Sequence, residues 1–292
     1  GGQVYVRDAT SFTNKTITNA YIKDGSTWRT VFTLFDTPTS YTTASDGAAF
    51  AVPTEANAIH IQSAVGAGGG GGGGLDYDRA GFEDGGGGGG SGAFTSDMVF
   101  SVTSGETLTP TISSSGGSGG AGVGEPPINT VGGTGGNTVL SGSSSGAVFT
   151  LNGGVGSAST GGRIPAPAST GGAGGSRTID ASQVLSSGTT VDGIDITSFT
   201  SGPVGSFNQQ GDGTTGPNGN RSSGDGTSVA GAAGGTSFNT SLPGGAGGTG
   251  SAVPGSAGSR GSGGGGGGSG NNSASGGDGG NGEIVYRFLR IA

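Results

Sequence analysis

Runs of consecutive glycine constrain this chain more than any other feature. Residues 68–74 are seven glycines and residues 85–90 are six, and glycine supplies 75 of the 292 residues. Glycine lacks a Cβ, so backbones can approach closely, but ordering it costs more entropy than ordering any other residue. Such runs are either flexible or ordered by hydrogen bonds to neighbouring segments.

Composition limits the size of any core. Hydrophobic residues make up 29% of the chain, well below the content of an ordinary globular domain. Charged residues make up only 10%, whereas disordered chains are usually rich in charge and poor in β-branched residues. Val, Ile, Phe, Tyr and Thr recur here in short alternating runs. We therefore expect an ordered chain, with disorder as the alternative.

Several functional classes are disfavoured. The chain has no Cys, and its only histidine, His60, lies between Ile59 and Ile61, so neither a zinc site nor a histidine-dependent triad is expected. A net charge of −8 disfavours nucleic acid as a partner. No apolar run is long enough to insert in a membrane, and the glycine runs lack the Lys-Ser/Thr ending of a phosphate loop. We expect no enzyme activity and no cofactor.

Two domains are predicted. Residues 1–43 form a β-rich module with an internal repeat, in which residues 4–8 match residues 20–24 at a spacing of 16. Turn residues between short alternating runs predict a hairpin. The aromatic residues of the repeat are the predicted attachment or oligomerisation contacts, which makes a homo-oligomer possible: Tyr5, Phe12, Tyr21 and Trp28.

Residues 44–292 form the predicted glycine-rich domain. Alternating apolar residues predict strands at its edges, and the alternation of residues 284–289 predicts a C-terminal strand that closes a sheet begun by the earlier ones. The expected strands cover residues 48–53, 58–62, 93–102, 108–112 and 283–291.

The glycine-rich segments have three possible structures. They can be flexible linkers. Collagen needs Gly at every third position with abundant Pro, and the chain has only 11 Pro, so collagen is excluded. The third structure is a bundle of polyglycine-II segments, which are polyproline-II-like and bond only to their neighbours. The predicted fold is all-β or non-regular: a short β-strand module, then a polyglycine-II bundle with a closing C-terminal strand. The expected segments are residues 116–124, 132–136, 153–162, 171–175, 231–235, 244–250 and 261–270.

The sequence also resembles a known family. Phe50-Ala51-Val52-Pro53 followed by residues 58–68, and the closing residues 277–285, resemble the glycine-rich domains of phage tail proteins. Residues 21–29 are similar to short modules of phage fibre proteins. The resemblance to T-even-type long-tail-fibre tip adhesins implies an extracellular virion protein that binds a bacterial surface receptor, either an outer-membrane protein or a glycan, and contacts other virion fibre proteins.

Two inserts are the candidate receptor-binding sites. Residues 75–84 place acids, an arginine and aromatics between two glycine runs, a composition suited to recognition. The aromatics could instead fold back over the bundle, and Asp76, Asp78, Glu83 and Asp84 could instead bind calcium. Residues 203–221 are the second insert, and residues 178–199 are expected to be a packed strand pair. The predicted contacts are Asp76, Tyr77, Asp78, Arg79, Phe82, Glu83, Phe207, Asn208, Gln209 and Gln210.

Two other functions remain open at this point. One is a purely structural fibre or filament subunit, whose polymer contacts come from residues 1–43. The other is an ice-binding protein, because polyglycine-II bundles can present flat Thr and Ser faces.

Overall fold

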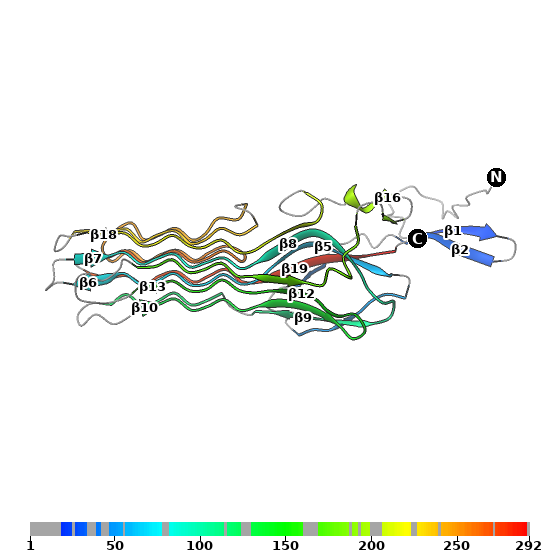
Figure 1. The fold of residues 1–292 in the computed structure, drawn as a ribbon, viewed down its shortest axis with the longest axis horizontal. Coiled ribbons are helices and arrows are strands. Elements are labelled where there is room, and N and C mark those ends of the chain that lie inside the picture. The colour runs from blue at the N-terminus through cyan, green and yellow to red at the C-terminus, as the bar shows by residue number, and fades with distance from the viewer. Residues whose placement is uncertain are drawn as a thin grey trace, which may run out of the picture.

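The computed structural model is essentially all-β, with antiparallel sheets and no α-helix among the described residues (Figure 1). The described residues include a three-residue 3-10 helix, η2 (Ile196–Ser198). The described residues are 19–24, 27–33, 39–41, 47–54, 56–77, 82–113, 116–123, 130–159, 169–186, 189–191, 194–198, 206–222, 227–238, 241–270 and 272–290.

Two five-stranded sheets lie at one end of the molecule. The first has the order β17 (Gln209–Gly211), β8 (Phe94–Ser101), β5 (Ala58–Val65), β19 (Glu283–Leu289) and β3 (Thr39–Tyr41). The second has the order β14 (Arg177–Ile179), β12 (Gly146–Leu151), β11 (Thr138–Gly142), β9 (Thr107–Ile112) and β4 (Phe50–Ala51).

Smaller sheets complete the strand set. The hairpin β1 (Asn19–Asp24) and β2 (Thr27–Thr33) stands alone among the described strands, as does β15 (Thr190–Val191) with β16 (Ile194–Asp195). At the other end of the molecule lie β6 (Leu75–Tyr77), β7 (Phe82–Asp84) and β18 (Arg221–Ser222), and β10 (Thr130–Val131) with β13 (Ala158–Ser159) (Figure 1).

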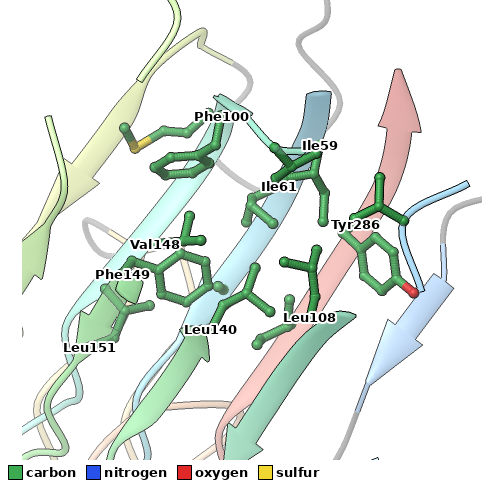
Figure 2. Packing of buried hydrophobic residues seen from close by; sticks show 14 of the residues in the cluster. Ile59, Ile61, Phe100, Leu108, Leu140, Val148, Phe149, Leu151 and Tyr286 are labelled. Carbon is green, nitrogen blue, oxygen red and sulfur yellow. The ribbon is translucent and has the colours of Figure 1, made fainter. Parts of the chain in front are cut away.

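The apolar core lies between the two five-stranded sheets (Figure 2). Ile59 and Ile61 of β5 and Phe100 of β8 face Leu140 and Phe149 of the second sheet, and all five are buried. At one edge, the ring of Phe50 in β4 stacks on Tyr286 of β19 at 4.6 Å between centroids. The scarce apolar residues of the chain are thus concentrated in this sandwich.

Most predicted strands are present with changed bounds. The C-terminal strand pairs with β5 as expected, with Ile284 opposite Ala64. The hairpin predicted in residues 20–28 is present as β1 and β2, with Lys23 opposite Trp28. Tyr5 and Phe12 lie outside the described residues. The expected strand at residues 48–53 is reduced to β4. Within residues 178–199, where a strand pair was expected, β15 pairs with β16.

Three segments that consist almost entirely of glycine run from the sandwich along the long axis of the molecule. These inner segments are residues 66–74, 85–93 and 261–268, and every residue in them is buried. Residues 68, 71 and 74 donate their amides to carbonyls of residues 280, 277 and 274, at 2.8–2.9 Å. Residues 69 and 72 donate instead to residues 90 and 87. Every third amide of this segment therefore bonds the same neighbour.

Each inner segment bonds to neighbours on all sides. The segment 66–74 exchanges backbone hydrogen bonds with six others, and they include the other two inner segments. An added Cβ at Gly71 would collide with the carbonyl of Gly265, and one at Gly88 with that of Ala233. The run of glycines at residues 68–74 is required because neighbouring backbones surround this segment and leave no room for a side chain. The six neighbours of residues 66–74 are residues 85–93, 116–123, 132–137, 152–157, 261–268 and 272–282.

Outer segments form a closed ring around the three inner ones. Each is hydrogen-bonded to the next, through backbone groups except where residues 212–220 meet residues 229–236. They are not pure glycine: an exposed residue recurs at every third position, as in Ser275, Asp278 and Asn281. Nearly pure glycine therefore distinguishes the inner segments from the outer ones, which carry an exposed residue at every third position. The ring consists, in order, of residues 116–123, 132–137, 152–157, 170–176, 212–220, 229–236, 243–250, 253–258 and 272–282.

Side chains at these exposed positions brace the ring. Asp278 Oδ1 accepts the amide of Gly119 at 2.8 Å, and Asn281 Oδ1 accepts that of Gly116 at 3.2 Å. Asn218 Oδ1 accepts the amide of Gly171 at 3.0 Å in the same way. Short amide and carboxylate side chains thus satisfy outward-facing N–H groups of the adjacent segment.

One predicted insert is in fact a segment of this ring. Residues 203–221 were expected to be a loop, but residues 212–220 run the length of the array between β17 and β18. Gly213, Gly216 and Gly219, three residues apart, face their neighbours and leave Thr215 and Asn218 exposed. The loop prediction was wrong because these glycines are isolated rather than consecutive.

Candidate functional site

The end of the molecule opposite the sandwich carries a hairpin, which we call the tip hairpin, formed by β6 and β7. Leu75 pairs with Asp84 and Tyr77 with Phe82, and residues 78–81 between the strands lie outside the described residues. The inner segments 66–74 and 85–93 lead into and out of it. The tip hairpin therefore stands on two of the three inner segments.

Two buried acids fix the tip hairpin to its surroundings. Asp84, 1% exposed, accepts hydrogen bonds from Arg221 of β18, with Nε–Oδ1 at 2.6 Å and Nη2–Oδ2 at 2.5 Å. Glu83 is fully buried, and its Oε2 accepts a hydrogen bond from Ser269 Oγ at 2.9 Å. β18 also pairs with β7 through the backbone, so three separate parts of the chain meet here.

These contacts change the interpretation of residues 75–84, the first predicted receptor-binding insert. Glu83 was predicted to contact a receptor, but its burial places it inside the array. The alternative calcium site loses Asp84, because both of its oxygens bind Arg221. No group of three or more His, Asp or Glu side chains suited to a metal occurs among the described residues. The side chains of Asp76, Tyr77 and Phe82, and all of Asp78 and Arg79, lie outside what the structure describes.

The second group of predicted contacts lies at the sandwich end. Gln209 and Gln210 belong to β17, which pairs with β8, and the amide of Asn208 donates to the carbonyl of Asp97 at 2.9 Å. Phe207 is half-buried against the cluster of Val99 and Ile196. Residues 212–220 of the array lie between this group and β18 beside the tip hairpin. The structure thus does not bring the two predicted groups together.

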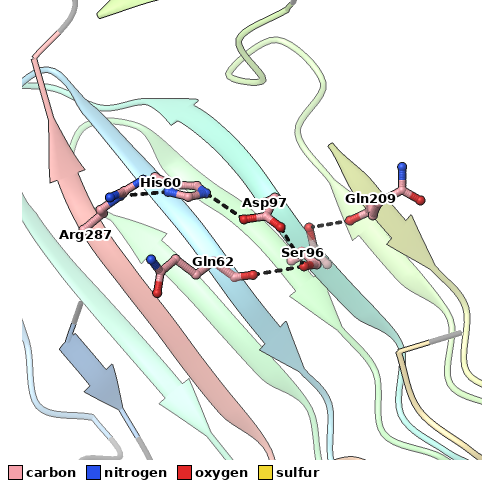
Figure 3. A network of polar contacts seen from close by, with 7 residues as sticks. His60, Gln62, Ser96, Asp97, Gln209 and Arg287 are labelled. Atoms are coloured by element: carbon pink, nitrogen blue, oxygen red, sulfur yellow. Dashed lines mark hydrogen bonds and ion pairs between the residues drawn. The ribbon is translucent and has the colours of Figure 1, made fainter. Parts of the chain in front are cut away.

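A buried polar network crosses the first sheet near β17 (Figure 3). His60 Nε2 donates to Asp97 Oδ1 at 3.1 Å, while its Nδ1 accepts from Arg287 Nε at 3.0 Å. These contacts fix a neutral imidazole with its proton on Nε2. Burial lowers the pKa of His60 below its ordinary 6.5, and the Arg287 charge adds to this effect. Together they outweigh the hydrogen bond to Asp97 and its charge, which raise the pKa.

This network does not have the arrangement of a catalytic site. A histidine oriented by a carboxylate can act as a general base when its other nitrogen faces a nucleophile. Here the other nitrogen of His60 faces Arg287, and both His60 and Asp97 are fully buried. Asp97 also adopts a positive φ of 51°, which its contacts must hold in place. The network therefore joins β19, β5 and β8, and the carbonyl of Asp97 joins them to Asn208.

Comparison with protein families identifies a match over most of the chain. The model of a glycine-rich domain family matches residues 42–289, which is most of the chain. The chain belongs to this family. No curated protein matches it. Within the described part of the chain, no helix is long and apolar enough to cross a membrane.

The glycine-rich domain contains polar partners that the sequence alone did not reveal. Arg221, Ser269 and Asp97 have no local motif, and their partners lie 137, 186 and 37 positions away in the chain. The one available signal was Asp97 itself, a charged residue within an apolar strand.

Proposed function

We propose that the array of inner and outer segments is a polyglycine-II bundle that serves as a rigid shaft. Polyglycine-II segments have three residues per turn and no internal hydrogen bonds. The three-residue period of the bonds made by residues 66–74, and their partition among six neighbours, support this assignment.

Such a shaft would present the parts of the chain that join its segments at the tip to a partner. At the tip, described segments end at the tip hairpin, at Val123 and Thr130, and at Ser159. The observation that carries the proposal is the anchoring of the tip hairpin by Asp84 and Arg221. An ordered base lets a short connection bind without a large loss of entropy.

The resemblance to phage tail-fibre tip adhesins suggests what the partner is. We propose that the tip, with Tyr77, Asp78, Arg79 and Phe82, contacts a bacterial surface receptor, either an outer-membrane protein or a glycan. The chain would then be an extracellular virion component without catalytic activity, joined to other fibre proteins through residues 1–43.

Binding of the purified chain to a panel of bacterial strains tests this proposal. A variant with Tyr77, Asp78, Arg79 and Phe82 all changed to Ser, but with Glu83 and Asp84 kept, should lose binding and retain its melting temperature. Ser104→Ala, in the turn before β9 at the opposite end, is the matched control and should bind normally. Equal binding by the tip variant would refute a receptor contact at the tip.

A purely structural role is the second candidate. The sheet β1–β2 pairs with no other described strand, so its edges can pair with another chain. This role predicts that the chain assembles without any receptor and that removal of residues 1–43 abolishes assembly. The ice-binding hypothesis gains little support, because Asp278 and Asn281 share an exposed row with Ser275 in place of a uniform Thr face.

A further inference from the structure

A pocket of about 250 Å³ lies where the shaft meets the sandwich. It opens beside β17, an edge strand of the first sheet, at the junction between residues 212–220 and 229–236. At this junction the outer ring is held through side chains: Thr214 Oγ1 donates to the carbonyl of Thr236 at 2.6 Å, and Asn220 Nδ2 to that of Ala230 at 3.3 Å. The pocket thus occupies the place where two outer segments part.

The pocket wall combines aromatic and polar groups. Phe94 and Phe238 form its apolar side, with ring centroids 5.4 Å apart. Gln210, Asp212 and Thr214 line the polar side. An apolar surface beside a few fixed hydrogen-bonding groups is the usual composition of a small-molecule site, and this pocket is smaller than the roughly 300–1,000 Å³ typical of that class.

Arg177 holds the polar side in place. Its Nε donates to Gln210 Oε1 at 3.2 Å and its Nη1 to Asp212 Oδ1 at 2.8 Å, while its own amide also donates to Asp212 Oδ1 at 3.1 Å. This orients the amide of Gln210, whose two N–H donors and the second oxygen of Asp212 remain for a ligand. Donors and acceptors side by side match the hydroxyls of a sugar, and the small exposed parts of Phe94 and Phe238, 7% and 2%, add a limited apolar contact.

The charge of the pocket selects among sugars. The carboxylate of Asp212 is balanced by Arg177, so the site has no excess of positive charge for a phosphate or a sugar acid. We propose that this pocket binds one or two rings of a neutral saccharide. The site is separate from the tip. It would add a second contact with a glycan-coated surface if the proposed function holds, but saccharide binding itself does not depend on that function.

Calorimetric titration of the full chain with neutral hexose and N-acetylhexosamine oligosaccharides tests the proposal. We expect saturable binding at up to about 10 mM, the weak range of a small polar ligand. Asp212→Ala and Gln210→Ala should each weaken it about tenfold or more. Asp278→Ala removes another exposed carboxylate that accepts a backbone amide, and should bind normally.

The remaining outcomes also decide the question. Absence of binding to every neutral saccharide, or equal binding by the Asp212→Ala and Gln210→Ala variants, would overturn the proposal, as would a preference for sialylated or phosphorylated sugars. The tip variant with four Ser substitutions should retain saccharide binding. A chain that binds saccharide but no bacterial strain would refute the tip contact and leave this site standing.

Discussion

Asp84 and Arg221, 137 positions apart, form a two-point ion pair at the tip, with one partner buried and the other partly exposed. Arg221→Ala would leave the carboxylate of Asp84 buried without this partner, and we expect it to cost about 3 kcal/mol. Hydrogen exchange should accelerate at Gly85, whose amide donates to Asn220 beside Arg221. Denaturant unfolding and exchange measure the two effects.

The exposed pair Arg177–Asp212 is the control for this measurement. Asp212 is 60% exposed, so Asp212→Ala should change the unfolding free energy by less than about 1 kcal/mol. Equal losses in Asp212→Ala and Arg221→Ala would show that burial of Asp84 does not govern the strength of its pair.

Inner and outer positions should differ in their tolerance of alanine. Gly71→Ala should destabilise the chain by at least about 2 kcal/mol, because its Cβ would collide with the backbone of residue 265. Thr134→Ala, at an exposed outer position, should be nearly neutral. Thermal unfolding compares the two variants, and a tolerant Gly71→Ala would contradict six-neighbour packing.

The same difference between inner and outer segments explains which of them could be predicted from the sequence. The consecutive glycines predicted close backbone packing, and alternation predicted β5, β8 and β19, because both signals are local. Segments with isolated glycines, such as residues 212–220, were missed because their period of three is diluted by Thr, Pro and Asn. Likewise, the partners of Asp84 and Glu83 could not be predicted, because they depend on which segments become neighbours in the array.

Stability should fall as the pH is lowered through the ordinary pKa of histidine. The pKa of His60 is lowered in the folded chain, chiefly by burial, so below pH 6.5 the unfolded state binds a proton that the folded state does not. The unfolding free energy is then highest above pH 6.5 and decreases below it, until the folded pKa is reached. Denaturant titrations between roughly pH 5.5 and 8 measure this slope.

His60→Gln provides the matched variant for that slope. Its amide can still donate toward Asp97 and accept from Arg287, but it does not titrate in this range. The pH dependence between those limits should flatten in the variant. An unchanged slope would mean that a group other than His60 is responsible.

The braces of the outer ring can be tested at a single amide. Asp278→Ala removes the acceptor of the Gly119 N–H, so exchange of that amide should accelerate, with a stability loss of about 1 kcal/mol. Asp278→Asn keeps an acceptor oxygen and should exchange at nearly the original rate. Accelerated exchange in both variants would assign the effect to charge and not to the hydrogen bond.

The closed ring leaves no vacant position beside the inner segments. Each connection between segments at the tip begins and ends at a position fixed by the array of inner and outer segments, whatever the length of the connection. Insertions there cost little loop entropy and disturb no packed glycine. Each connection can therefore lengthen, shorten or be exchanged independently of the others, so this architecture can diversify one outer surface while its framework stays constant.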